Sequence, residues 1–422
     1  MDDLWAKYVH MIQNYSNTIF LDSGHDILFI QYKGILNFCS ELLKYIYRNL
    51  MYSSNLDLNN NKYLLLCSSI KKNVEPIYKE LYDKLNKNYN TANYINFSSQ
   101  KLYFRMYIFK SLIISFYLSI KLLFISYKYK EYKFKFRFAH VFINIFYGLH
   151  FKYIAKHIFL LTKPKVIIVN SERNSKISTI LNLVKSYQIR SYFICNELPG
   201  NHLYPLLSNN VFFWDDFHLN QVLNENQLIN GYIIGNYEVQ NATFINQNRI
   251  NSAFKHFKEN EYILFLDDYD GNLVRDKYEF TIKYNQFMYD ICKQNPEKQF
   301  IFKNRQFVKN LVPGQNQINQ LSNTIIYNGE LDLSLFLSWN KIKAVGGVSS
   351  QGLYVSSQLN IPTFRLFFKN IQKPIPIIDH NVQLITNHSQ FNKFLKNNTI
   401  QSNKTYNFKN ITDEIVKIIT EK

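Results

Sequence analysis

The residues best suited to chemistry lie near the C-terminus, in the run Gly346-Gly-Val-Ser-Ser-Gln-Gly352. The pattern predicts a short strand, a tight turn on Gly346 and Gly347, and a helix that opens at Ser349 or Ser350. Paired glycines let a backbone approach a ligand closely, and a helix start offers N–H groups and the positive end of its dipole. Serine there can cap the helix or bind phosphate oxygens. The run therefore suggests a site for an anionic, nucleotide-linked ligand.

The same run also fits an ordinary strand–turn–helix junction that is capped by serine. It lacks the Gly-Lys-Ser/Thr of a P-loop, and the chain has no G-x-G-x-x-G. Its functional weight comes from its neighbours. Lys303 and Arg305 follow a predicted strand at 299–303 and could neutralise a phosphate, and Gln351 adjoins the serine pair. The alternative for both cations is solvated loop charge.

Side chains that could act as a general base follow two predicted strands. Asp22, His25 and Asp26 come at and after the apolar run 18–22, and Glu197 lies in the loop 196–200. A reaction that deprotonates a hydroxyl needs such a base. A helix cap explains Asp22 equally well.

One acidic run, Asp267-Asp-Tyr-Asp-Gly271, invites a metal interpretation. With Gly271 at the sixth position of an EF-hand loop, the first position is Leu266 and the twelfth is Lys277, so the pattern fails. We expect no metal site and interpret the run as a loop.

The composition indicates a folded cytoplasmic protein with an anionic partner. The chain has 422 residues, is 46% hydrophobic and carries a formal charge of +18. Its four cysteines are far apart, as expected of free thiols in a reducing compartment. The N-terminus is acidic, unlike a signal peptide, so we expect the protein to stay in the cytoplasm.

Much of the charge lies in residues 101–137, which are also rich in aromatic and aliphatic side chains. The almost wholly apolar stretch 111–127 falls short of the ~20 residues of a bilayer span and contains Lys121. No nucleic-acid-binding signature accompanies it, so we expect no nucleic-acid partner. An interfacial helical pair on an anionic membrane surface fits better, and the alternatives are a buried helix of the core and a transmembrane helix. The expected surface cations are Lys128, Lys130, Lys133, Lys135 and Arg137.

Strands alternate with helices after Pro164, which predicts doubly wound parallel sheets. The first series has strands at 165–170, 189–195, 210–214 and 231–235. The second has strands at 262–266, 299–303, 324–327, 344–345 and 363–366. We expect a domain over 1–236 with a helical insertion at about 101–161, a polar linker at 237–260, a domain over 261–400 and a final helix in 401–422.

Several of these segments together resemble the GT-B glycosyltransferases of capsule and surface-polysaccharide synthesis. The segments are Lys163-Pro-Lys-Val-Ile-Ile-Val-Asn-Ser171, Phe213-Trp-Asp-Asp-Phe217, Ile233-Ile-Gly-Asn236, Phe300-Ile-Phe-Lys303 and the Gly346–Gly352 run. The resemblance covers about 163–366, and related families include CDP-polyol phosphotransferases and sialyltransferases. The chain departs from the pattern at Asn196-Glu-Leu-Pro-Gly200, where relatives have Gln-His-Gly, and at Asn304-Arg305, where they have His-Pro.

The resemblance implies two Rossmann-like domains facing a cleft. It also implies transfer from a nucleotide-sugar donor to a glycan or lipid-linked glycan acceptor, without metal or cofactor, at the inner membrane. Gly346, Gly347, Ser349, Ser350 and Gln351 would bind the donor. A CDP-polyol phosphotransferase and a non-catalytic membrane-bound scaffold are the alternatives.

Overall fold

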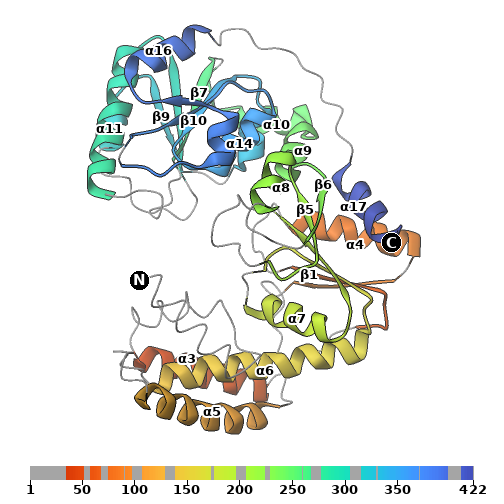
Figure 1. The fold of residues 1–422 in the computed structure, drawn as a ribbon. Coiled ribbons are helices and arrows are strands. Elements are labelled where there is room, and N and C mark those ends of the chain that lie inside the picture. Colours follow the sequence, from red (N-terminus) through yellow and green to blue (C-terminus); the bar gives the residue numbers. More distant parts are fainter. Residues whose placement is uncertain are drawn as a thin grey trace. The chain divides into compact units, whose positions relative to one another are not determined.

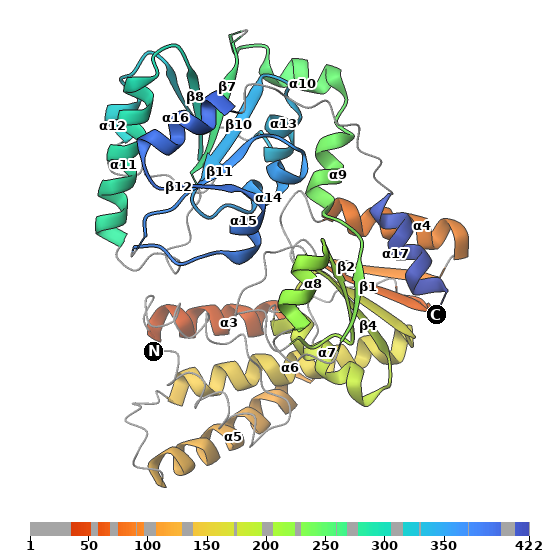
Figure 2. The ribbon, with the colours of Figure 1, turned by 45° about the horizontal axis from the view of Figure 1, so that its top comes forward.

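The structure is a computed structural model of the chain. It describes residues 35–51, 58–67, 75–89, 91–96, 107–128, 138–172, 175–195, 206–223, 229–258, 260–267, 277–304, 315–328, 331–369, 371–397 and 410–421. These residues form two compact units. The first comprises residues up to Ile234 together with Thr412–Lys422, and the second is built from Gly235–Ile411. Each unit contains one six-stranded parallel sheet (Figures 1 and 2).

The sheet of the first unit has the order β2-β1-β3-β4-β5-β6. Its strands are β1 (Tyr63–Cys67), β2 (Ala92–Asn96), β3 (Val166–Val169), β4 (Arg190–Ile194), β5 (Asn210–Phe213) and β6 (Asn230–Ile233). Every residue of β1, β3 and β5 is buried, as expected of parallel strands covered on both faces. The sequences of β1 and β3 are continuous apolar runs for that reason.

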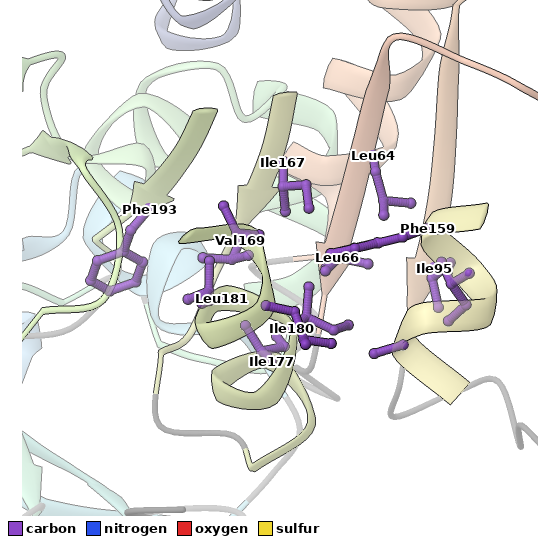
Figure 3. Packing of buried hydrophobic residues seen from close by; sticks show 14 of the residues in the cluster. Leu64, Leu66, Ile95, Phe159, Ile167, Val169, Ile177, Ile180, Leu181 and Phe193 are labelled. Carbon is purple, nitrogen blue, oxygen red and sulfur yellow. The ribbon is translucent and has the colours of Figure 1, made fainter. Parts of the chain in front are cut away.

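Helices pack on this sheet through a continuous apolar core. The helices of the unit are α3 (Ile35–Met51), α4 (Glu75–Tyr89), α5 (Ile108–Lys128), α6 (Phe138–Thr162), α7 (Ser175–Ser186), α8 (Asp216–Leu223) and α17 (Ile411–Thr420). Figure 3 shows Ile177, Ile180 and Leu181 of α7 beneath the strands. The helix α17 lies beside α4, where Lys84 Nζ donates to Thr412 Oγ1 and pairs with Asp413 Oδ1, both at 2.6 Å.

The sheet of the second unit has the order β12-β11-β10-β7-β8-β9. Its strands are β7 (Tyr262–Asp267), β8 (Gln299–Asn304), β9 (Thr324–Tyr327), β10 (Ile342–Gly347), β11 (Thr363–Leu366) and β12 (Gln383–Ile385). Its helices are α9 (Tyr237–Thr243), α10 (Gln247–Phe254), α11 (Lys277–Gln294), α12 (Gln315–Ile318), α13 (Leu333–Ser338), α14 (Gln351–Gln358), α15 (Pro376–Asn381) and α16 (His388–Asn397).

Two parallel sheets with their helices confirm the predicted α/β class with two Rossmann-like domains. The strands expected after Pro164 are all present, within a few residues of their predicted ends. The expected strand at 18–22 lies outside the described residues.

Two expectations differ from the structure. Residues 237–260, expected as a linker, contain α9 and α10, whose starts are capped by Asn236 and Asn246. Val239, Ile250 and Phe254 of these helices are buried, so the segment is folded into the second unit. Gly346 and Gly347, expected in a turn, are the last two residues of β10.

The helical insertion of the first unit comprises α5 and α6, which pack against each other. Within the described ranges, no helix combines the length and apolar character that a bilayer span requires.

Candidate functional site

The junction between β10 and α14 lies at the topological switch point of the second sheet. Along the chain, β7, β8 and β9 extend the sheet in one direction, whereas β10, β11 and β12 extend it in the other. The strand order reverses between β7 and β10, and in doubly wound sheets ligands bind beyond the carboxyl ends of the strands at this point. Gly347 is the last residue of β10, so the serine pair follows directly at the expected position.

The strand register determines which charged residues lie beside Gly347 at the carboxyl edge of the sheet. Gly347 pairs with Leu266 of β7, and Leu266 pairs with Lys303 of β8. On its other side Gly347 pairs with Arg365 of β11. With neighbouring strands ~4.8 Å apart, the backbone of Lys303 is roughly 10 Å from that of Gly347. One edge therefore brings together the glycine pair, the serine pair and a lysine from separate parts of the sequence.

The two glycines of the site are required by packing. A Cβ at Gly346 would lie 2.1 Å from the ring of Phe364, and one at Gly347 would lie 2.9 Å from the backbone oxygen of Leu266. Phe364 cannot easily yield, because it also packs on Phe391 and Phe394. Their lack of a side chain thus allows close packing of strands rather than a turn.

Ser350 begins the helix α14. Its Oγ accepts a hydrogen bond from the N–H of Gly352 at 3.2 Å, and its carbonyl accepts from the N–H of Leu353 at 3.0 Å. Gly352 is packed so closely that a Cβ there would meet side chains of Leu266 and Leu333 at 2.5 Å. The positive end of the α14 dipole is thereby held against the carboxyl edge of the sheet. Ser349 and Gln351 flank the cap and are half-buried.

Arg365 is a buried residue of β11 that holds the short segment between β10 and α14. It is fully buried, and its Nε donates to the carbonyl of Val348 at 2.7 Å. Its Nη2 donates to the carbonyl of Lys373 at 2.8 Å, and its Nη1 pairs with Asp379 Oδ1 at 2.5 Å. Asp379 in turn accepts from the N–H of Ile375 at 2.8 Å. Burial lowers the pKa of the guanidinium, an effect that Asp379 opposes.

Lys303 of β8 lies two strands from Gly347, in register with it through Leu266 of β7. Its ammonium lies 5.7 Å from the ring centre of Phe336 and is half-buried. Burial lowers the pKa of Lys303, and the nearby carboxylate of Asp332 opposes that shift. A partly desolvated ammonium interacts more strongly with an anion than an exposed one does.

The remaining predicted site residues lie outside the described part of the chain. These are Asp22, His25, Asp26, Glu197, Arg305, Lys130, Lys133, Lys135 and Arg137. Lys128 is the last residue of α5, and its side chain is not described. Their roles stay predictions.

The first unit contains a buried polar group that sequence reasoning missed. His218 of α8 lies with its Nε2 3.5 Å from Cys195 Sγ, and its Nδ1 accepts from the N–H of Trp214 at 3.4 Å. Burial lowers the pKa of His218 to about 4, which Asp215 partly opposes. The imidazole is therefore neutral near pH 7.

Glu172, just beyond β3, is a second residue that sequence reasoning missed. Its carboxylate accepts from the N–H groups of Leu207 and Ser208 at 2.6 and 2.7 Å. It fixes the entry to β5. The partners of Glu172 are 35 and 36 residues away, and Cys195 is 23 residues from His218, so neither contact has a local sequence signal.

Comparison with solved structures identifies the architecture. UDP-GlcNAc 2-epimerase from Neisseria meningitidis, bound to UDP-GlcNAc, matches with a TM-score of 0.54 at 14% identity, over 85% of this chain and 100% of that one. The enzyme of that name from Methanocaldococcus jannaschii, in complex with UDP-GlcNAc and UDP, matches with a TM-score of 0.51 at 14% identity, over 85% and 99%.

These two proteins are UDP-sugar enzymes of GT-B-like fold, and at this level of identity the likeness shows the fold. The chain has the GT-B-like fold. No protein-family profile and no curated protein matches the sequence.

Proposed function

We propose that the chain is a glycosyltransferase that moves a sugar from a nucleotide-sugar donor to a growing surface glycan, such as capsule or lipopolysaccharide. The observation that carries the proposal is the position of Gly346–Ser350 at the switch point of the second sheet. The nucleotide-sugars held by proteins of the same fold are consistent with it.

The donor phosphates would lie at the start of α14. The backbone at Ser349, Ser350 and Gln351 and the side chains of Ser349 and Gln351 would contact their oxygens, while the Ser350 hydroxyl caps the helix, and the helix dipole would favour the phosphate charge. Lys303, assisted by Arg305, would neutralise the charge that develops on the departing nucleoside diphosphate. Arg365 would act only by positioning the loop at Val348.

In the proposed reaction an acceptor hydroxyl oxygen bonds to the anomeric carbon as the bond from that carbon to the phosphate oxygen breaks. The electron pair leaves with the nucleoside diphosphate, and the hydroxyl proton passes to a base. Asp22, His25, Asp26 and Glu197 are the candidates for that base. No metal or cofactor takes part.

The proposed location is the cytoplasmic face of the inner membrane, where the chain is a peripheral protein. A glycan or lipid-linked glycan is the proposed acceptor. The charge of +18 supports an anionic surface as partner.

Product analysis tests the function. The protein is incubated with CMP-, CDP-, UDP-, GDP- and dTDP-linked donors, with and without lipid-linked glycan, and the nucleotide products are separated. Acceptor-dependent release of a nucleoside diphosphate, or of CMP from a CMP-sugar, is the expected result. Release of CMP from a CDP-polyol would identify the phosphotransferase, and conversion of UDP-GlcNAc without nucleotide release would identify an epimerase. No turnover of any donor would favour the scaffold.

A further inference from the structure

The helix α5 buries a row of serine side chains and exposes large apolar ones, the opposite of an ordinary amphipathic helix. Its small polar residues Ser111, Ser115 and Ser119 are fully buried, whereas Phe109 and Ile113 are 67% and 71% exposed. A surface helix of a soluble domain normally places apolar residues inward and polar residues outward. The side chains of Phe109 and Ile113 are thus left for another partner.

The serine stripe explains how this packing is tolerated. Ser115 Oγ donates to the carbonyl of Ser111 at 2.5 Å, and Ser119 Oγ donates to the carbonyl of Ser115 at 2.6 Å. These two hydroxyls are therefore satisfied within the helix itself. Small side chains also let α5 approach α6 closely, as they do in helix pairs that face lipid.

The outward face is continuous along the helix. Phe109, Ile113, Phe116 and Tyr117 follow one another at helical spacing and are all more than half exposed. Leu112 is half-buried and does not belong to this face. This stripe, Phe109–Ile113–Phe116–Tyr117, is called the α5 face.

Positive charge flanks the α5 face. Lys110 is exposed beside it, with its ammonium 5.0 Å from the ring centre of Tyr153. The helix ends at Lys128, and the sequence continues with Lys130, Lys133, Lys135 and Arg137. An apolar stripe that contains aromatic rings, with Lys110 beside it and further cations following it in the sequence, matches the interface of an anionic bilayer.

We infer that the α5 face is the surface by which the protein docks on an anionic lipid bilayer. The phenylalanine, isoleucine and tyrosine side chains enter the boundary between headgroups and acyl chains, while Lys110 contacts lipid phosphates. The inference deepens the proposed function, on which it rests for the membrane location. It does not depend on the transfer reaction.

The test is flotation of the full chain with vesicles of phosphatidylcholine and phosphatidylglycerol, compared with phosphatidylcholine alone. The variant Phe109→Ser/Ile113→Ser/Tyr117→Ser should bind the anionic vesicles at least about tenfold more weakly, because it loses the apolar insertion. The matched control is Phe244→Ser/Ile282→Ser, which removes exposed apolar residues of the second unit and should bind like the wild type. The single variant Ile113→Ser should show an intermediate loss, which covers the case of a triple variant that folds poorly.

Equal vesicle binding by the wild type and the triple variant would overturn the inference, as would no binding by the wild type at low salt. It would also fall if the substitutions abolished self-association rather than lipid binding, since the α5 face would then be a protein interface. Thermal stabilisation by a nucleotide-sugar, measured in the same variants, reports on the proposed function separately. Failure of one assay therefore leaves the other interpretable.

Discussion

Arg365 has a charged side chain inside the second unit and makes hydrogen bonds to two carbonyls and a carboxylate. In the sequence it stands within the short run Thr363–Leu366, which predicts a strand and nothing more. Its partners Val348, Lys373 and Asp379 come from three different segments. Only the folded chain shows that a single guanidinium holds the segment after β10 and the start of α15.

Replacing Arg365 by Met should destabilise the protein by about 3–5 kcal/mol, because Asp379 is left without its cation in a site that is nearly closed to water. The measurement is urea unfolding followed by circular dichroism. Arg365→Lys, which keeps the charge but cannot form the three-way arrangement, should recover part of the loss. A change below about 1 kcal/mol in Arg365→Met would show that the ion pair does not fix this region.

We expect His218 to lower the free energy of unfolding of the protein at acidic pH. The pKa of His218 is lowered from 6.5 to about 4 in the folded state. Between these two pH values the imidazole is therefore mostly protonated in the unfolded chain and mostly neutral in the folded chain. The free energy of unfolding is therefore highest above pH 6.5 and falls by about 3 kcal/mol in total as the pH drops through 4.

The experiment is urea unfolding of the wild type and of His218→Gln between pH 7 and pH 4. Other groups titrate alike in both proteins, so the difference between the two curves isolates the imidazole. The wild type should lose more stability on the acid side than the variant does. Parallel curves would mean that His218 is protonated in the folded protein at its ordinary pKa.

At the scale of elements, Ser350 determines where α14 begins. Its hydroxyl caps Gly352 and is nearly closed to solvent. We expect Ser350→Ala to lose about 1 kcal/mol of stability and to weaken nucleotide binding, because the helix start is no longer fixed. Ser350→Asn supplies an alternative cap and should restore both.

Calorimetric titration with the preferred nucleotide, combined with thermal unfolding, distinguishes capping from direct contact. If Ser350→Asn regains stability but still binds the nucleotide weakly, then the serine hydroxyl itself contacts the phosphate. The capping account would in that case be wrong.

The elements that the sequence predicted well are those with a strong local pattern. The runs that became β3 and β7 are apolar throughout and bounded by polar residues, so each is identified from its own composition. The helices α9 and α10 were missed because their segment is polar. The only local signals for these helices are Asn236 and Asn246, which cap their N-termini. Phe254 attaches α10 to the second unit by stacking on Trp339, with ring centres 4.1 Å apart.

The candidate site was predicted in part. The sequence predicted that the Gly-Gly-Val-Ser-Ser run and Lys303 lie at strand ends, and the structure confirms this position. Their role in ligand binding stays a prediction. The roles of the two glycines were misjudged, since their neighbours Phe364 and Leu266 are known only from the fold. Strand order, which creates the switch point, depends on pairing between segments far apart in the chain and has no local signal.

At the scale of the whole molecule, the chain enters the second unit after Ile234 and returns to the first with α17. The returning helix is fixed by polar contacts, with Thr412 Oγ1 donating to Glu80 Oε1 at 2.5 Å and Lys84 pairing with Asp413. Each unit thus has its own parallel sheet and its own switch point. The proposed donor site lies on the second unit, and the proposed docking face lies on the first.

The central claim is that this molecule binds a nucleotide-sugar at the start of α14. Thermal unfolding of the full chain with CMP-, CDP-, UDP-, GDP- and dTDP-linked donors tests it most directly, because a ligand that binds the folded state raises its stability by about 2.7 kcal/mol at a hundredfold excess over Kd. We predict that one nucleotide class at a hundredfold excess over Kd raises Tm by roughly 2–4 °C, that the rise grows with the logarithm of its concentration, and that Ser349→Ala/Ser350→Ala shows a smaller rise. No rise with any donor, or an equal rise in that variant, would contradict the account.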